Sequence, residues 1–166
     1  MPNAKEPPFV GARVIPTAAV IVVEQLPTNH PNQTQELDTV SIVSSTEPEW
    51  RGPVLESMRK LLSLGPNWNS YGAEPIDRRA VQSALDLLAE TMPPTAPAPQ
   101  VVPSSRGGLQ LEWHLRDIEL EVLVLPSELF SVCFEDLRSH TIEEQEPGSD
   151  AGLLTKALHE LTRRAT

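Results

Sequence analysis

The sequence has little cysteine and few aromatic residues, and its basic side chains are outnumbered by acidic ones. Cys133 is the single cysteine, so an intramolecular disulfide is excluded and a reducing compartment is favoured. Lysine and arginine number 13 against 23 aspartates and glutamates, which gives a formal net charge of −10. Such a surface repels phosphate groups, so we expect no nucleic-acid binding by direct phosphate contact. A basic protein partner or a cation is the more natural attraction.

Long hydrophobic runs are also missing. No segment approaches the roughly 20 apolar residues of a membrane span. The apolar run at residues 18–23 is too short for a signal peptide and follows a proline-rich start. We therefore expect a cytoplasmic protein that does not contact membranes.

Proline, in contrast, is abundant, with 17 residues against a usual share of about 5%. The prolines cluster at residues 2–53 and 93–103, and residues 27–39 are polar and rich in turn formers. This distribution predicts two parts. Residues 1–49 form a Pro-rich arm with short β-prone runs, and residues 50–166 form an α+β domain.

Apolar residues at helical spacing predict three helices in the domain. The first follows Pro53 and ends at Gly65-Pro66, a strong stop signal. The second begins at Asp77 and the third at Asp150, both as N-caps. The apolar positions are Val54, Leu55, Met58, Leu61 and Leu62, then Val81, Ala84, Leu85, Leu88 and Met92, then Leu153, Leu154, Ala157, Leu158 and Leu161.

Between the second and third helices the period changes from 3.6 to 2, after an extended connector at residues 93–103. Apolar and polar residues alternate over 109–115, 118–124 and 130–135, which predicts three consecutive strands. The order is therefore helix, helix, three strands, helix. We expect an α+β fold, an antiparallel meander of three to five strands packed on one face by two to three helices.

The register of these strands follows from the turns. A two-residue turn at 116–117 pairs Leu115 with Ile118 and Trp113 with Leu120. A three-residue turn at 126–128 then pairs Leu120 with Phe134. All apolar residues fall on one face, as a hairpin over a core requires.

The opposite face is predicted to be acidic. One row across the strands contains His114, Glu119 and Glu135, and the next contains Glu112, Glu121 and Cys133. Directly opposed like charges cost a few tenths to about 1 kcal/mol, so these rows favour a neutralising cation.

Four explanations of the acidic rows stay open. A divalent zinc, manganese or iron ion could take His114, Glu119 and Glu135 as ligands, although no tight ligand spacing is present. A basic partner could supply arginine or lysine. Side chains of the chain itself could reach over the face, or the carboxylates could simply be solvated. The candidates for such internal neutralisation are Arg106, Arg116 and Arg138.

A short loop, GPNWNSYGAEP at residues 65–75, contains Trp68 and Tyr71 in a chain with only 4% aromatics. Aromatic side chains bury large areas, so packing on the core is one role for them. Anchoring a partner is the other, because Trp and Tyr dominate interaction hot spots.

Three strings in the central region, NWNSYGAEPI, PQVVPSSRGGLQLEWH and IELEV, resemble in that order a pattern of uncharacterised small bacterial proteins. The resemblance covers about residues 61–135. It implies no activity, but it does imply that the loop and the Gln-x-Glu-Trp strand belong to one unit. Trp68, Tyr71, Glu112 and Trp113 are then expected to be neighbours, with the loop beside the acidic face.

These observations favour a non-catalytic interaction module of a bacterial cytoplasmic system that binds a basic protein and needs no cofactor. The expected contact residues are Trp68, Tyr71, Glu112, His114, Glu119, Glu121 and Glu135. One alternative is a metal-dependent hydrolase with Glu112 or Glu121 as general base. Another is an antitoxin-like or immunity-like inhibitor of a neighbouring gene product. The sequence leaves the oligomeric state open.

Overall fold

The computed structural model describes residues 47–165, which form one compact unit. Nearly all of the predicted arm, residues 1–46, lies outside this described part. The helices are α1 (Arg51–Leu62), α2 (Arg78–Thr91) and α3 (Gly152–Ala165). The strands are β1 (Gln100–Pro103), β2 (Leu109–Leu115), β3 (Ile118–Val124), β4 (Phe130–Asp136) and β5 (Thr141–Gly148).

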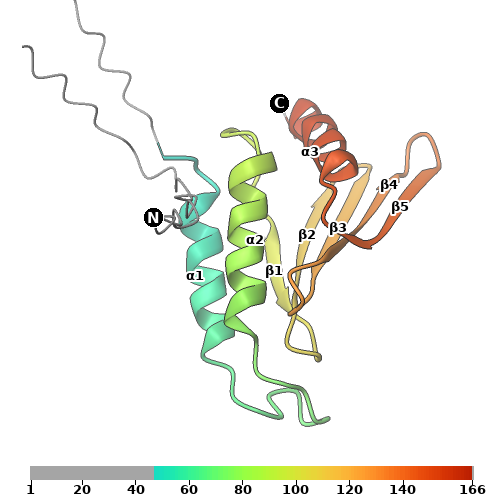
Figure 1. Ribbon diagram of the computed structural model, residues 1–166. Coiled ribbons are helices and arrows are strands. Elements are labelled where there is room, and N and C mark those ends of the chain that lie inside the picture. Colours follow the sequence, from blue (N-terminus) through green and yellow to red (C-terminus); the bar gives the residue numbers. More distant parts are fainter. Residues whose placement is uncertain (1–46, 166) are drawn as a thin grey trace, which may run out of the picture. The chain divides into compact units, whose positions relative to one another are not determined.

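The strands form one antiparallel sheet in the order β1-β2-β3-β4-β5 (Figure 1). This meander with three helices confirms the predicted α+β class. The structure adds β1 and β5, the two edge strands, to the three strands expected from alternation. β1 lies inside the Pro-rich connector, whose sequence favours extended backbone without revealing a pairing partner. β5 was not predicted because its residues are mostly polar on both faces, so they show no alternation of apolar and polar positions.

The predicted register is confirmed. Leu115 pairs with Ile118 and Trp113 with Leu120 across the β2–β3 hairpin. In the next hairpin Leu120 pairs with Phe134. Because side chains alternate along a strand, this register places every predicted apolar position on one face and Glu112, Glu119, Glu121 and Glu135 on the other.

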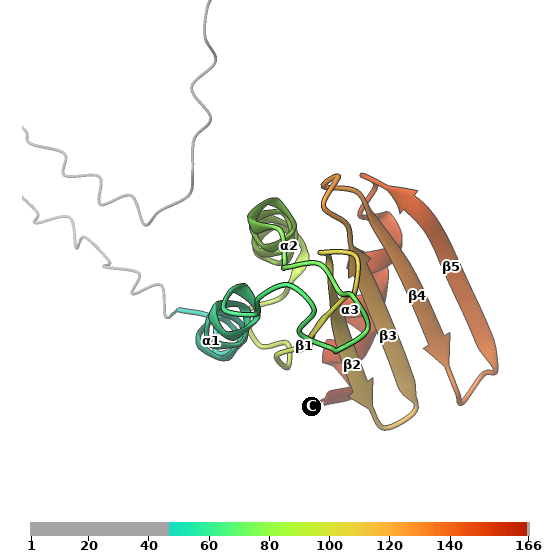
Figure 2. The same cartoon turned by 90° about the horizontal axis from the view of Figure 1, so that it is seen from below.

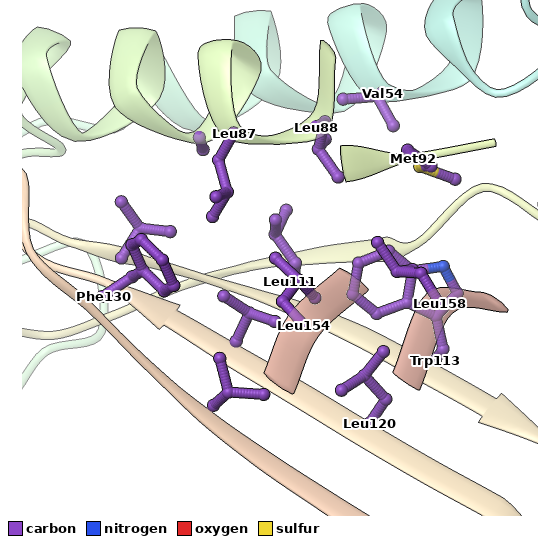
Figure 3. Packing of buried hydrophobic residues seen from close by; sticks show 14 of the residues in the cluster. Val54, Leu87, Leu88, Met92, Leu111, Trp113, Leu120, Phe130, Leu154 and Leu158 are labelled. Atoms are coloured by element: carbon purple, nitrogen blue, oxygen red, sulfur yellow. The ribbon is translucent and has the colours of Figure 1, made fainter. Parts of the chain in front are cut away.

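The core lies between the apolar face of the sheet and the helices. α2 contacts β3, α3 contacts β3 and β4, and α1 contacts β1. Figure 2 shows the helices gathered beside and behind the strands. In Figure 3, Leu87 and Leu88 of α2 point toward Leu111 of β2. Trp113 is 3% exposed, and its Nε1 donates to the Pro97 carbonyl at 2.9 Å, which ties the connector to the sheet.

Both predicted helix starts use the expected side chains. Asp77 accepts a hydrogen bond from the Arg79 backbone N–H at 2.8 Å at the start of α2. Asp150 accepts one from the Gly152 N–H at 3.0 Å at the start of α3. Each carboxylate satisfies a backbone donor that has no partner within the helix.

Two adjacent glycines build the turn between β1 and β2. Gly107 has φ of +77°, a left-handed conformation that disfavours side chains. Gly108 lies against β3, and a Cβ added there would stand 2.4 Å from the Val124 carbonyl oxygen. The Gly-Gly pair in SSRGG is therefore required by backbone geometry.

A nearly buried ion pair ties α3 to the end of β4. Arg164 and Asp136 are 11% and 12% exposed in their side chains. Two guanidinium nitrogens contact the two carboxylate oxygens at 3.1 and 2.6 Å, and Arg164 Nε donates to Glu160 at 2.6 Å. The Asp136 carboxylate also accepts the backbone N–H of Arg138. These charged hydrogen bonds hold the pKa of Asp136 far below its usual range, with Arg164 as the main cause.

Candidate functional site

The polar face of the sheet carries the two rows that the sequence predicted. His114 pairs with Glu119 and Glu119 with Glu135, so these three lie in one row. The next row contains Glu112, Glu121 and Cys133, and β5 adds Glu144 beyond them. The opposed pairs of like charge, Glu119 with Glu135 and Glu112 with Glu121, are therefore real neighbours.

His114 lies between two of these carboxylates. Its Nδ1 contacts the Glu119 carboxylate, and its Nε2 stands 3.4 Å from Glu112 Oε2. Hydrogen bonding to Glu119 first, and to Glu112 second, raises the pKa of His114 above its ordinary value. The protonated imidazole can donate to both carboxylates, which offsets part of the repulsion within the rows.

The raised pKa of His114 predicts a measurable order among variants. In an NMR titration of the imidazole, we expect a pKa above about 6.5 in the wild type. Glu119→Gln should lower it more than Glu112→Gln, because Glu119 is the stronger partner. The associated stability is present below the unfolded pKa and is lost as the pH rises through the folded value. Since His114 is half exposed, we expect only about 0.5 kcal/mol. A wild-type pKa at or below the ordinary value would contradict this arrangement.

A hollow of about 370 Å³ lies on the same face, over β2 to β5. Its lining includes the carboxylates of Glu121, Glu144 and Glu146 and no lysine or arginine. Gln110 Nε2 donates to Glu121 at 3.0 Å, a neutral contact that leaves the negative charge in place. Glu144 and Glu146 were not among the predicted contact residues, because the mostly polar sequence of β5 does not predict a strand.

Cys133 lines this hollow but is a poor nucleophile. Burial, and then the negative charge of Glu144, raise the pKa of the Cys133 thiol. The thiolate is the reactive form, so its population at neutral pH is reduced. The lining therefore favours binding of a cation over covalent chemistry.

The arginines considered above do not neutralise the rows. Arg138 pairs with Asp117, outside the rows. Among residues 47–165, no ion pair joins Arg106 or Arg116 to the acidic face. Within the same described range, no group of three or more His, Cys, Asp or Glu side chains is arranged to hold a metal ion. The structure brings His114 to Glu119 and Glu112, but shows no contact between His114 and Glu135.

The aromatic loop is held by its own asparagines. Asn67 accepts a hydrogen bond from the Gly72 N–H, and Asn69 accepts from the N–H groups of Tyr71 and Ala73. Asn67 and Gly72 adopt left-handed backbone, with φ of +61° and +84°. Asparagine and glycine tolerate this conformation best, which suits Asn67 and Gly72 to their positions, and Ser70 between them shares it with φ of +64°.

The two aromatic residues of this loop have different environments. Trp68 is partly buried, and its Nε1 donates to the Glu74 carbonyl at 3.0 Å. Tyr71 is 91% exposed, so the core-packing explanation is wrong for this residue. A large side chain held in water by an internally bonded loop has no evident role in the stability of the fold.

The loop and His114 lie at opposite ends of β2. The Glu74 N–H donates to Ser105 and the Asp77 N–H to Gly107, which attaches the loop to the turn before Leu109 (Figure 1). His114 is five residues after Leu109 along the strand, a span on the order of 17 Å. The loop therefore does not cover His114, and Tyr71 and the His114 row form separate surfaces.

No protein-family model, curated protein or solved structure matches the chain. None of the helices within residues 47–165 is long and apolar enough to cross a membrane. The acidic face and the aromatic loop are therefore the features of the molecule that bear on its function.

Proposed function

We propose that this protein is a non-catalytic interaction module of a bacterial cytoplasmic system, and that it binds a basic protein partner through the acidic sheet face. The observation that carries the proposal is the hollow beside Glu121, Glu144 and Glu146, whose lining has three carboxylates and no cationic side chain. The contact surface extends over the rows of Glu112, His114, Glu119, Glu121 and Glu135.

The energetics of the face support a cationic partner. Opposed glutamates destabilise the isolated sheet slightly. His114 offsets the repulsion only where it contacts Glu119, at the end of β2. Arginine or lysine from a partner would form charge-assisted hydrogen bonds with the same carboxylates. Complementary charge also raises the association rate and makes it sensitive to salt.

The loop offers a second contact. Tyr71 is exposed on a loop whose backbone is already ordered by Asn67 and Asn69, while Trp68 holds its base. Because the loop backbone is already ordered, a partner that binds Tyr71 does not have to order the loop as well, which suits this aromatic side chain to anchor a partner.

Charge reversal tests the proposal. We expect the tagged wild type to capture one stoichiometric partner from its own cells at low salt and less of it at moderate salt. The double variant Glu121→Lys/Glu144→Lys should lose the partner at both salt concentrations, because it places positive charge in the hollow. The captured partner, once identified, is then titrated against both purified proteins, and we expect at least about a tenfold weaker dissociation constant for the variant.

The matched control is Asp86→Lys/Glu90→Lys, which reverses the same number of exposed charges on α2, away from the lining of the hollow. It should bind the partner nearly as the wild type does. Equal binding of the partner by the wild type and the double variant would show that the acidic face is not the binding surface.

A further inference from the structure

The two edge strands of the sheet, β1 and β5, differ in how many unpaired backbone groups they present. β1 has only four residues and ends at Pro103, which has no N–H to donate, and α1 contacts it. β5 has eight residues and pairs only with β4 (Figure 1). Pro147 near its end also lacks an N–H, so the full set of backbone donors and acceptors extends over the six residues 141–146. Among the described elements, none pairs with its outer side. β5 therefore presents the longer row of backbone groups to which another strand could bond.

The side chains of β5 oppose pairing with a second copy of the same strand. Ile142 and Glu144 lie on the acidic face, next to Glu135 and Cys133, and Glu146 lines the hollow there. Pairing β5 with another β5 would bring these glutamates close to one another, and neighbouring like charges are destabilising. Carboxylates on an edge prevent self-association, but they attract a strand that carries lysine or arginine.

The helix-facing side of β5 borders a groove of about 580 Å³ between α3 and the β4–β5 hairpin. Phe134, which is 5% exposed, is the one apolar side chain in its lining, and the other lining residues are polar or charged and include Thr141 and Glu143 of β5. The exposed surface of the groove is nevertheless more apolar than polar. The charge of Glu143 is compensated by Lys156, whose Nζ stands 2.7 Å from its carboxylate. This side of the edge thus offers apolar surface and paired charges, whereas the other side offers unpaired carboxylates.

We propose that β5 accepts an extended segment of the partner as a sixth strand of the sheet. Alternate side chains of the segment are lysine or arginine and lie beside Glu144 and Glu146. The intervening side chains are apolar and lie at the groove that contains Phe134. The inference rests on the proposed function for the basic character of the partner, and it adds the binding mode and the alternating pattern.

The test uses a labelled nine-residue peptide of alternating lysine and valine and measures its binding to the full chain by fluorescence anisotropy. Two further peptides carry N-methyl groups on the lysine amides or on the valine amides. Only alternate residues of an added strand bond to the edge it joins. We therefore expect one methylated peptide to bind at least about tenfold more weakly than the parent, and the other to bind nearly as well.

Each other outcome overturns the inference in an identifiable way. If both methylated peptides bind as the parent does, or lose affinity equally, backbone pairing at the edge is refuted while charge attraction stands. If the parent peptide does not bind, the β5 mode is refuted, and the capture experiment with Glu121→Lys/Glu144→Lys still judges the proposed function separately. A peptide of alternating glutamate and valine that binds equally well would refute both proposals.

Discussion

Replacing Arg164 with alanine is expected to lower the melting temperature by on the order of 10 °C. The change leaves the Asp136 carboxylate nearly buried without its two guanidinium contacts, and an uncompensated charge in that setting is strongly destabilising. It also detaches the end of α3 from β4. The measurement is thermal unfolding by circular dichroism on the full chain at neutral pH.

The matched control is Arg138→Ala, which breaks an ion pair that is 68% exposed on the arginine side. Exposed pairs contribute little, so we expect a much smaller change. Equal effects of the two substitutions would show that burial of the Arg164 pair is not what stabilises this end of the helix.

The same pair gives a pH dependence with a definite sign. The pKa of Asp136 is lowered in the folded state, so its contribution to stability is present above the unfolded value near 4 and is lost as the pH falls toward the folded value. The difference in stability between wild type and Asp136→Asn should therefore be full at pH 7 and shrink below about pH 4. A difference that grows on acidification would contradict the assignment.

Gly108→Ala is expected to destabilise the protein by roughly 1 to 3 kcal/mol. The added methyl group would stand 2.4 Å from the Val124 carbonyl oxygen, and a backbone atom in a paired strand cannot move aside as a flexible side chain can. The β1–β2 turn or the start of the β2–β3 pairing must shift instead. Urea unfolding followed by tryptophan fluorescence measures the loss.

Gly65→Ala serves as the control, because a Cβ at Gly65 meets nothing within 4 Å. It should leave stability nearly unchanged. If Gly108→Ala is tolerated as well as Gly65→Ala, the close approach of the turn to β3 does not constrain the sequence.

Both substitutions also concern function, because each acts near one of the proposed surfaces. The turn that contains Gly107 and Gly108 accepts the hydrogen bonds that attach the aromatic loop. Arg164 and Asp136 fasten α3 beside the groove on the helix side of β5. A loss of partner binding in either variant should therefore be interpreted only together with its stability.

Much of the sheet could be predicted from residues close in the chain. Strict alternation from Leu109 to Glu135 assigns each side chain to a face, and short turns then leave one register that keeps all apolar residues together. For this reason the sequence alone predicts the pairing of Glu119 with Glu135 and of Glu112 with Glu121. The helix starts at Asp77 and Asp150 could also be predicted from neighbouring residues, because a capping side chain bonds to a backbone N–H only two residues later in the chain.

The edges and the loop depended on contacts between distant residues. β1 is stabilised as a strand by β2, not by alternation of its own, and β5 has polar residues on both faces. Arg164 and Asp136 are 28 residues apart in the chain, so no local pattern signals their pairing. The orientation of Tyr71 likewise depends on where Asn67 and Asn69 bond, which composition does not reveal.

The sequence by itself determined the fold class, the central register and the two rows of His114, Glu119 and Glu135 and of Glu112, Glu121 and Cys133, because periodicity and capping are local properties of the chain. Only the tertiary structure decided that β5 extends the acidic face with Glu144 and Glu146. It also decided that the β5 edge lies between the acidic hollow and the groove beside α3, and that Tyr71 faces solvent. These features depend on which segments meet in space, and that outcome is set by burial of the shared core as a whole.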